Sequence, residues 1–77
     1  MKLLYFAMVR EKLKKSEEDI EFSGTVSQLR DLLIRKYPEL EPILKVVRFA
    51  VNEEYVDEDY FIGQNDRVAI IPPVSGG

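Results

Sequence analysis

The sequence contains neither cysteine nor histidine in its 77 residues. Zinc, iron–sulfur and haem sites of the usual kinds need those residue types as ligands, so their absence excludes such sites. It also excludes Ser-His-Asp and Cys-His catalysis. A disulfide framework is impossible, which suits a reducing compartment. We therefore predict a protein that holds no metal ion and no bound cofactor.

Long apolar runs are missing too. The opening MKLLYFAMV is apolar over a short stretch and leads into REKLKK, a pattern typical of a buried strand rather than a signal peptide. No stretch approaches the ~20 apolar residues that span a bilayer. The net charge of −3 argues against nucleic acid as the main partner, because such binding depends on neutralising phosphates. These features predict a cytoplasmic protein that binds neither membrane nor nucleic acid.

The composition is that of one folded domain. Hydrophobic residues make up 45% of the chain and charged residues 32%, which separates it from disordered sequences. A chain of 77 residues can form one modest core but no large enclosed active site. We assign residues 1–73 to the folded domain and residues 74–77 to an extended tail.

Hydrophobic alternation predicts several short strands, at residues 2–9, 17–23, 46–51, 55–56 and 67–71. The first strand is apolar on both sides, which is typical of the centre of a sheet, whereas the second is polar on one side. The connection REKLKKS is too short for a crossover helix, so we expect the first two strands to form an antiparallel hairpin.

A single long helix is predicted between the second and third strands. Thr25 is a suitable N-cap, and Gln28 stands three residues later, as in a capping box. Apolar residues then recur at helical spacing, namely Val26, Leu29, Leu33 and Tyr37. Pro38 ends the helix, because the residue before a proline avoids helical geometry. We expect residues 39–45 to be mostly irregular and residues 57–66 to form a loop.

The order strand, strand, helix, strand, strand, strand predicts an α+β fold of the β-grasp, or ubiquitin-like, type. In this fold a mixed sheet of about five strands packs on one main helix. The first and last strands are the most apolar, so we expect them to pair at the centre of the sheet. The helix then covers one face of the sheet and leaves the other face open.

Side-chain alternation sorts the strand residues between the two faces of the sheet. The cations Lys2, Arg48 and Arg67 mark the face that points away from the helix. By the same alternation, Phe6, Met8 and Ile71 are apolar residues on that open face. We predict that these three residues, extended by Tyr55 and Arg10, form a protein-docking patch. The competing interpretation is that they are scattered surface residues, which are common in folded proteins.

The chain ends in IIPPVSGG. Pro72 and Pro73 fix the backbone and favour an extended conformation. The following residues, Val74, Ser75, Gly76 and Gly77, end in two positions without side chains, so the tail can enter a narrow channel. The carboxylate of Gly77 would arrive first. This design suits chemistry performed on the C-terminus inside another protein, although glycine-rich tails without function are also common.

The tail motif, together with YFAMVRE, Thr25-Val26 and VNEEYV, resembles the sulfur-carrier small subunits of molybdopterin synthase, a ubiquitin-like family. The resemblance covers essentially the whole chain, and the Pro-Pro-Val-Ser-Gly-Gly end is its specific part. One departure is the segment from Gly63 to Arg67, where the family often has Gly-Asp-Glu before the last strand.

The resemblance implies that an adenylating enzyme like ubiquitin's E1 activates the Gly77 carboxylate with ATP and Mg²⁺. A sulfur donor protein then makes a thiocarboxylate. The large synthase subunit accepts the tail, and sulfur passes to cyclic pyranopterin monophosphate. The chain would be a sulfur-donor subunit without catalytic side chains, in a heterotetramer. A carrier for thiamine or another pathway, a ubiquitin-like protein modifier and a simple interaction domain remain as alternatives.

Overall fold

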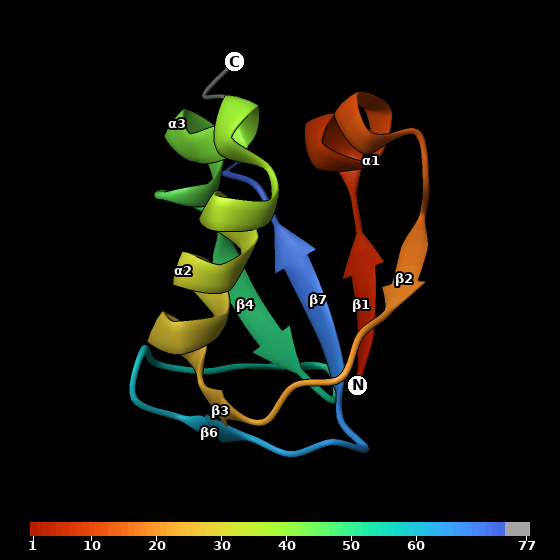
Figure 1. Cartoon of the computed structure of the whole chain (residues 1–77). Helices are drawn as coiled ribbons and strands as arrows, with labels where there is room; N and C mark the ends of the chain where they lie inside the picture. The colour runs from red at the N-terminus through yellow and green to blue at the C-terminus, as the bar shows by residue number, and fades with distance from the viewer. Residues whose placement is uncertain (74–77) are drawn as a thin grey trace.

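A mixed sheet with one long helix across it organises residues 1–73, the part of the chain that the computed structural model describes (Figure 1). The strands of this sheet are β1 (Lys2–Tyr5), β2 (Glu17–Asp19), β4 (Arg48–Val51), β5 (Glu54–Tyr55) and β7 (Arg67–Ile71). Their order is β2-β1-β7-β4-β5. β1 is parallel to β7, whereas the other neighbours are antiparallel. The predicted β-grasp fold, with the first and last strands paired at the centre, is confirmed.

The long helix is α2 (Val26–Lys36), which lies across one face of the sheet (Figure 1). Its predicted capping box is confirmed, because the Thr25 hydroxyl accepts from the Gln28 N–H at 3.1 Å and the Gln28 amide oxygen accepts from the Thr25 N–H at 2.9 Å. The helix ends with Tyr37 as C-cap, directly before Pro38. None of the helices in the described residues is long and apolar enough to cross a membrane.

The hydrophobic core fills the space between α2 and the sheet. Its most deeply buried members are Leu3, Tyr5, Val9, Val26, Leu29, Leu33, Leu44, Phe49, Ile62, Val68 and Ile70. Those on β1, β4 and β7 come from every second position, on the side that faces α2, as alternation predicts. The core therefore fixes which strand residues face away from α2.

The N-terminal region differs from the prediction. β1 stops at Tyr5, and residues 7–13 form the helix α1 (Ala7–Leu13) in place of a longer strand and a polar connection. Residues such as Ala, Met, Glu, Lys and Leu favour helix, and Val9 and Leu13, four positions apart, both pack on the core. The chain turns into α1 at Ala7, with φ of 50°, and leaves it at Lys14, with φ of 58°.

Two further segments also differ from the prediction. Residues 38–44 form the 3₁₀ turn η1 (Pro38–Leu40) and the short helix α3 (Glu41–Leu44), each with a proline in its first turn. The second predicted strand ends at Asp19, and a separate small sheet pairs β3 (Gly24–Thr25) with β6 (Phe61–Ile62). A strand of two residues is too short to show hydrophobic alternation, so the sequence did not predict β3 and β6.

The hairpin between β4 and β5 turns through Asn52 and Glu53. Both residues have positive φ, 50° and 73° respectively. Two consecutive positive φ values in a two-residue hairpin loop define a type I′ turn, whose twist matches that of the strands. This turn brings Tyr55 back opposite Ala50 at the edge of the sheet.

Candidate functional site

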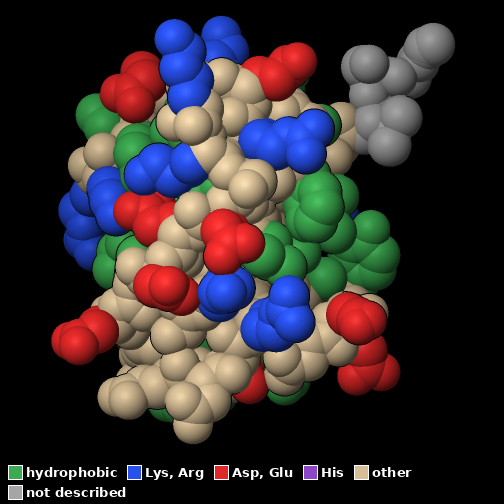
Figure 2. All heavy atoms as spheres, turned by 90° about the vertical axis from the view of Figure 1, so that its right-hand side faces the viewer, with side chains coloured by type: hydrophobic (Ala, Val, Ile, Leu, Met, Phe, Trp, Pro, Cys, Tyr) green, Lys and Arg blue, Asp and Glu red, His purple; other side chains and the backbone are tan. Residues whose placement is uncertain are grey.

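The face of the sheet that points away from α2 is built in cross-strand rows. Leu4 of β1, Ala69 of β7 and Ala50 of β4 are paired in one row, and Tyr55 of β5 extends it. In the space-filling view, hydrophobic side chains gather on the right of the molecule, the side that lies behind the sheet in Figure 1 (Figure 2). The open face predicted from alternation is therefore present.

A shallow depression of about 360 Å³ lies on this face. It is lined by Leu4, Phe6, Ala50, Asn52, Glu53, Arg67 and Ala69. The two alanines leave room between the larger side chains, which is why the sheet is hollowed there. The alternation that places Arg48 on this face also places Ala50 there, but it does not reveal the depression. Ala50 is only 6% exposed, because it lies between the neighbouring strands β7 and β5.

The predicted docking residues lie on and around this face, which we call the docking face: Tyr55 is on the edge strand β5, Ile71 ends β7, and Phe6 and Met8 follow the end of β1. Phe6, Met8 and Tyr55 are 44%, 45% and 59% exposed, unusually high values for large apolar side chains. Phe6 and Met8 reach the surface from the N-cap and first turn of α1, so the assumption that they lie on a strand was wrong. Ile71 is half-buried, and it pairs with Arg48 of β4.

Two cations flank the docking residues. The Arg48 guanidinium stacks over the Tyr55 ring, with 4.6 Å between its central carbon and the ring centroid. Arg10 lies exposed on α1, two residues after Met8. An aromatic side chain beside a guanidinium is typical of protein interfaces, where both types are enriched. The arrangement can bind another protein.

We call Pro72 and Pro73, which follow the last residue of β7, the tail root. β7 is the central strand of the sheet, so Ile70 is paired with Tyr5 of β1 and with Phe49 of β4, and Ile71, the last residue of β7, is paired with Arg48 of β4. Pro72 is buried and Pro73 is exposed, so the chain leaves the domain between these two residues. The predicted tail residues Val74, Ser75, Gly76 and Gly77 lie outside the described residues.

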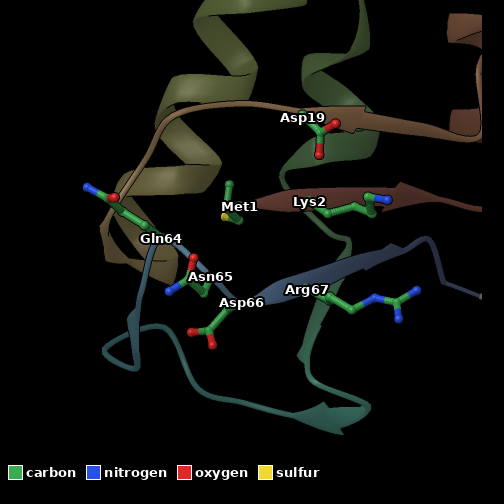
Figure 3. A pocket seen from close by; sticks show the side chains of 7 residues that line it. All are labelled: Met1, Lys2, Asp19, Gln64, Asn65, Asp66 and Arg67. Carbon is green, nitrogen blue, oxygen red and sulfur yellow. The ribbon is translucent and has the colours of Figure 1, made fainter.

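A second, polar pocket lies at the opposite end of β7, where Lys2 and Arg67 stand side by side on parallel strands (Figure 3). Met1, Asp19, Gln64, Asn65 and Asp66 complete its lining. Asp66 accepts hydrogen bonds from the Gly63 N–H at 2.8 Å and from Asn52 at 3.1 Å. These bonds lower the pKa of Asp66, with the Gly63 N–H as the main cause. They tie a turn together at the end of β7 that lies away from the tail root.

The strongest pKa shifts occur on the helix side of the sheet, around Glu18. Burial raises the pKa of the Tyr5 hydroxyl far above its usual value, and its hydrogen bond to Glu18 raises it further. Lys36, which also binds Glu18 at 2.6 Å, has a raised pKa because of that hydrogen bond. Since these groups bind one another inside the fold, they stabilise the domain and are not part of the docking face.

The comparisons with known proteins agree with this geometry. The ThiS family matches residues 3–77. A molybdopterin synthase sulfur carrier subunit from Dictyostelium discoideum is 44% identical over 82 aligned positions, covering 99% of this chain and 94% of the relative.

Solved structures share the fold as well. One from Pyrococcus furiosus, named for subunit 1 of molybdopterin converting factor, is 28% identical with a TM-score of 0.82, covering 95% of each chain. A chain from a complex of subunits 1 and 2 of that factor, from Helicobacter pylori, is 22% identical with a TM-score of 0.70, covering 99% of this chain and 96% of its own. The present chain therefore belongs to the ThiS family, in the same group as the molybdopterin synthase sulfur carrier subunits.

Proposed function

We propose that the chain carries sulfur on its C-terminal Gly77 for the synthesis of molybdopterin. The observation that carries this proposal is the position of the tail root. The central strand β7 leads through Pro72 and Pro73 into Val-Ser-Gly-Gly, directly beside an apolar docking face. The family match, which extends through residue 77, supports a role for this end of the chain.

The stiffness of the chain before the tail favours insertion of the tail into a partner. A strand with neighbours on both sides gives a rigid base, and a proline after it restricts the direction of the chain. Four extended residues reach roughly 13–14 Å, at 3.3–3.6 Å per residue. Val74, Ser75, Gly76 and Gly77 would thus place the terminal carboxylate well inside a channel while the docking face rests on the channel's rim.

Activation of Gly77 needs a second protein. A free carboxylate is a poor electrophile, so an E1-like adenylating enzyme would join it to the α-phosphate of ATP, with Mg²⁺, and release pyrophosphate. A sulfur donor protein would then displace AMP and leave a thiocarboxylate on Gly77. The chain has no cysteine, so none of its own side chains is a thiol that could attack the acyl-adenylate. We place these steps in the cytoplasm.

Transfer would take place in the large subunit of molybdopterin synthase, with two carriers on a dimer of large subunits. The large subunit would supply the catalytic groups, and the thiocarboxylate sulfur would pass to cyclic pyranopterin monophosphate. The product dithiolene contains two sulfurs, so each product needs two carrier visits. In this scheme the described residues dock and aim the tail, and they take no part in proton transfer.

Thiol labelling tests the proposal directly. The chain is incubated with its activating enzyme, MgATP and a sulfur source, and then treated with an alkylating probe. Since the sequence has no cysteine, a single adduct on the C-terminal peptide identifies a Gly77 thiocarboxylate. A variant that lacks Gly77 is the matched control and should give no adduct. An unlabelled wild-type chain, in the presence of an active enzyme and donor, would contradict the proposal.

The identity of the acceptor needs its own measurement. A thiocarboxylated carrier that has not been alkylated, and that supports pterin-dependent sulfur transfer by the large subunit, supports the molybdopterin pathway. If the same unalkylated carrier feeds thiazole synthesis instead, the thiamine pathway is indicated. Covalent conjugates on a denaturing gel that disappear when Gly77 is deleted would indicate a protein modifier.

A further inference from the structure

The charged side chains are separated between the two ends of the molecule, although the net charge is only −3. The end where β7 stops also contains α1, the last turn of α2 and α3 (Figure 1). Most of the 11 Lys and Arg residues lie there, and we call them the basic pole: Arg10, Lys12, Lys14, Lys15, Arg35, Lys36, Lys45 and Arg48. Figure 2 shows Lys and Arg side chains clustered around this upper end.

Few acidic residues accompany the basic pole, namely Glu11, Glu39, Glu41 and Glu18, whose carboxylate binds Lys15 and Lys36. The opposite end is acidic and contains Asp19, Glu21, Glu53, Glu54, Asp57, Glu58, Asp59 and Asp66. Lys2, Arg67 and the N-terminal ammonium of Met1 are cations at that end, and Arg30 pairs with Glu58. The molecule is therefore an electric dipole whose positive end carries the tail root.

Several cations of the basic pole are free to act on a partner. Within residues 1–73, Lys15 and Lys36 are paired with Glu18, and Lys45 with Glu41. Arg10, Lys12, Lys14 and Arg35 form no ion pair with another described residue. The helix ends account for part of the concentration of cations at this end of the molecule, because cations stabilise the C-terminal turns of α1 and α2.

The helix ends do not account for all of it. Lys15 and Arg48 lie outside the helices and their caps, yet they belong to the same end of the molecule. The depressions described above are lined by neither Lys12, Lys14 nor Arg35, so these cations do not converge on a site for a small anion. The acidic opposite end would repel an extended nucleic acid. A protein surface is the partner that fits a spread-out charge of this kind.

The basic pole is continuous with the docking face. Phe6 and Met8 lead into the part of α1 that carries Arg10 and Lys12, and Arg48 lies opposite Ile71. A protein that covers the apolar residues next to the tail root must therefore also face these cations. Its complementary surface is an apolar patch bordered by carboxylates.

We infer that the basic pole steers the carrier, tail first, onto an acidic rim around the channel that receives the tail. This inference rests on the proposed function. A dipole in the field of an acidic surface turns its positive end towards that surface before contact. Charges of this kind act mainly on the association rate, and salt weakens them.

The test is the association rate constant with the large synthase subunit, measured by stopped flow at low and moderate salt. We expect the wild-type rate constant to fall about tenfold between 20 and 200 mM NaCl. The variant Lys12→Gln/Lys14→Gln/Arg35→Gln should associate about three- to tenfold more slowly at low salt, with an almost unchanged dissociation rate. The matched control Glu54→Gln/Asp57→Asn/Asp59→Asn, at the acidic end, should not associate more slowly than wild type.

The outcomes separate the two proposals. A rate constant that does not fall with salt, or that the basic-pole variant leaves unchanged or increases, would overturn the steering inference while leaving sulfur transfer intact. Competition by an RNA oligonucleotide at the same salt would overturn it in favour of a nucleic-acid partner. No binding of wild-type carrier at either salt concentration, in contrast, would contradict the proposed function as well. The salt series on the wild-type chain needs no variant, so it decides the question even if a variant folds poorly.

Discussion

The Tyr5 hydroxyl donates a hydrogen bond of 2.6 Å to Oε1 of Glu18, which links the buried side of β1 to the edge strand β2. Tyr37 donates to the same oxygen at 3.0 Å, and Lys36 donates to the other oxygen at 2.6 Å. One carboxylate thus joins two strands to the C-terminal end of α2. Burial alone would raise the pKa of Glu18, but the hydrogen bonds from Lys36, Tyr5 and Tyr37 outweigh it and lower the pKa to about 2.

The first prediction concerns acid stability. The pKa of Glu18 is lower in the folded chain than its ordinary value of 4.5, so its contribution is complete above about pH 5 and is lost as the pH falls towards 2. We expect the free energy of unfolding to drop by about 2–3 kcal/mol over this range because of Glu18. Urea unfolding from pH 2 to pH 7 measures it. Glu18→Gln should flatten the curve, whereas Glu17→Gln, exposed on the same strand, should retain it.

The second prediction concerns Arg30, which joins three parts of the chain. Its guanidinium donates to the carbonyl oxygens of Leu44 and Val47 at 2.6 and 3.0 Å and forms two hydrogen bonds with Glu58. Lysine lacks this fork, so Arg30→Lys leaves buried acceptors unpaired and should cost about 2–3 kcal/mol. Thermal unfolding should show a fall of roughly 8–20 °C. Arg35→Lys, exposed on the same helix, is the control, and an equal effect of the two would refute this role.

The third prediction concerns the type I′ turn. Glu53 adopts φ of 73°, which costs a residue with a side chain roughly 1–2 kcal/mol relative to glycine. Glu53→Gly should stabilise the domain by about 0.5–1 kcal/mol, after the greater freedom of glycine in the unfolded chain is subtracted. The matched variant Asn52→Gly should destabilise it. The Asn52 side chain donates to Asp66 and accepts from the Arg67 N–H, both at 3.1 Å, and glycine cannot replace these bonds. A lower melting temperature for Glu53→Gly would contradict this account.

The fourth prediction concerns the docking face. Phe6→Asp places a charge on the apolar patch beside the tail root, so the affinity for the large subunit should fall at least about tenfold. Phe61, which is 65% exposed on β6 at the other end of the molecule, provides the control (Figure 1). Phe61→Asp should leave the affinity within about twofold, as expected outside an interface. Equal losses in the two variants, measured by calorimetry, would show that the docking face is assigned wrongly.

Sequence reasoning succeeded where one local rule dominates. The Thr25–Gln28 capping box and Pro38 fix the ends of α2 through backbone hydrogen bonding and sterics that need no tertiary contact. The pairing of β1 with β7 followed from their apolar character on both faces. The open face was predictable because a single helix covers only one side of a sheet.

Sequence reasoning failed where strand alternation and helical spacing fit the same residues. Phe6 and Met8 continue the alternation of β1, and the same stretch also satisfies helical spacing through Val9 and Leu13. The fold decides between them: the chain turns at Ala7, with φ of 50°, and α1 then buries Val9 completely. The depression at Leu4, Ala50 and Ala69 was missed for another reason. Alanine in a strand looks neutral in sequence, and only the cross-strand register brings two alanines together.

The central position of β7 has a consequence for how the domain is made. Without residues 67–71 the sheet separates into two pairs, β1 with β2 and β4 with β5, each with an exposed strand edge. The segment that completes the sheet is therefore also the segment that leads to Gly77. Truncation before Arg67 therefore removes the strand that joins the two pairs together with the end of the chain that carries Gly77.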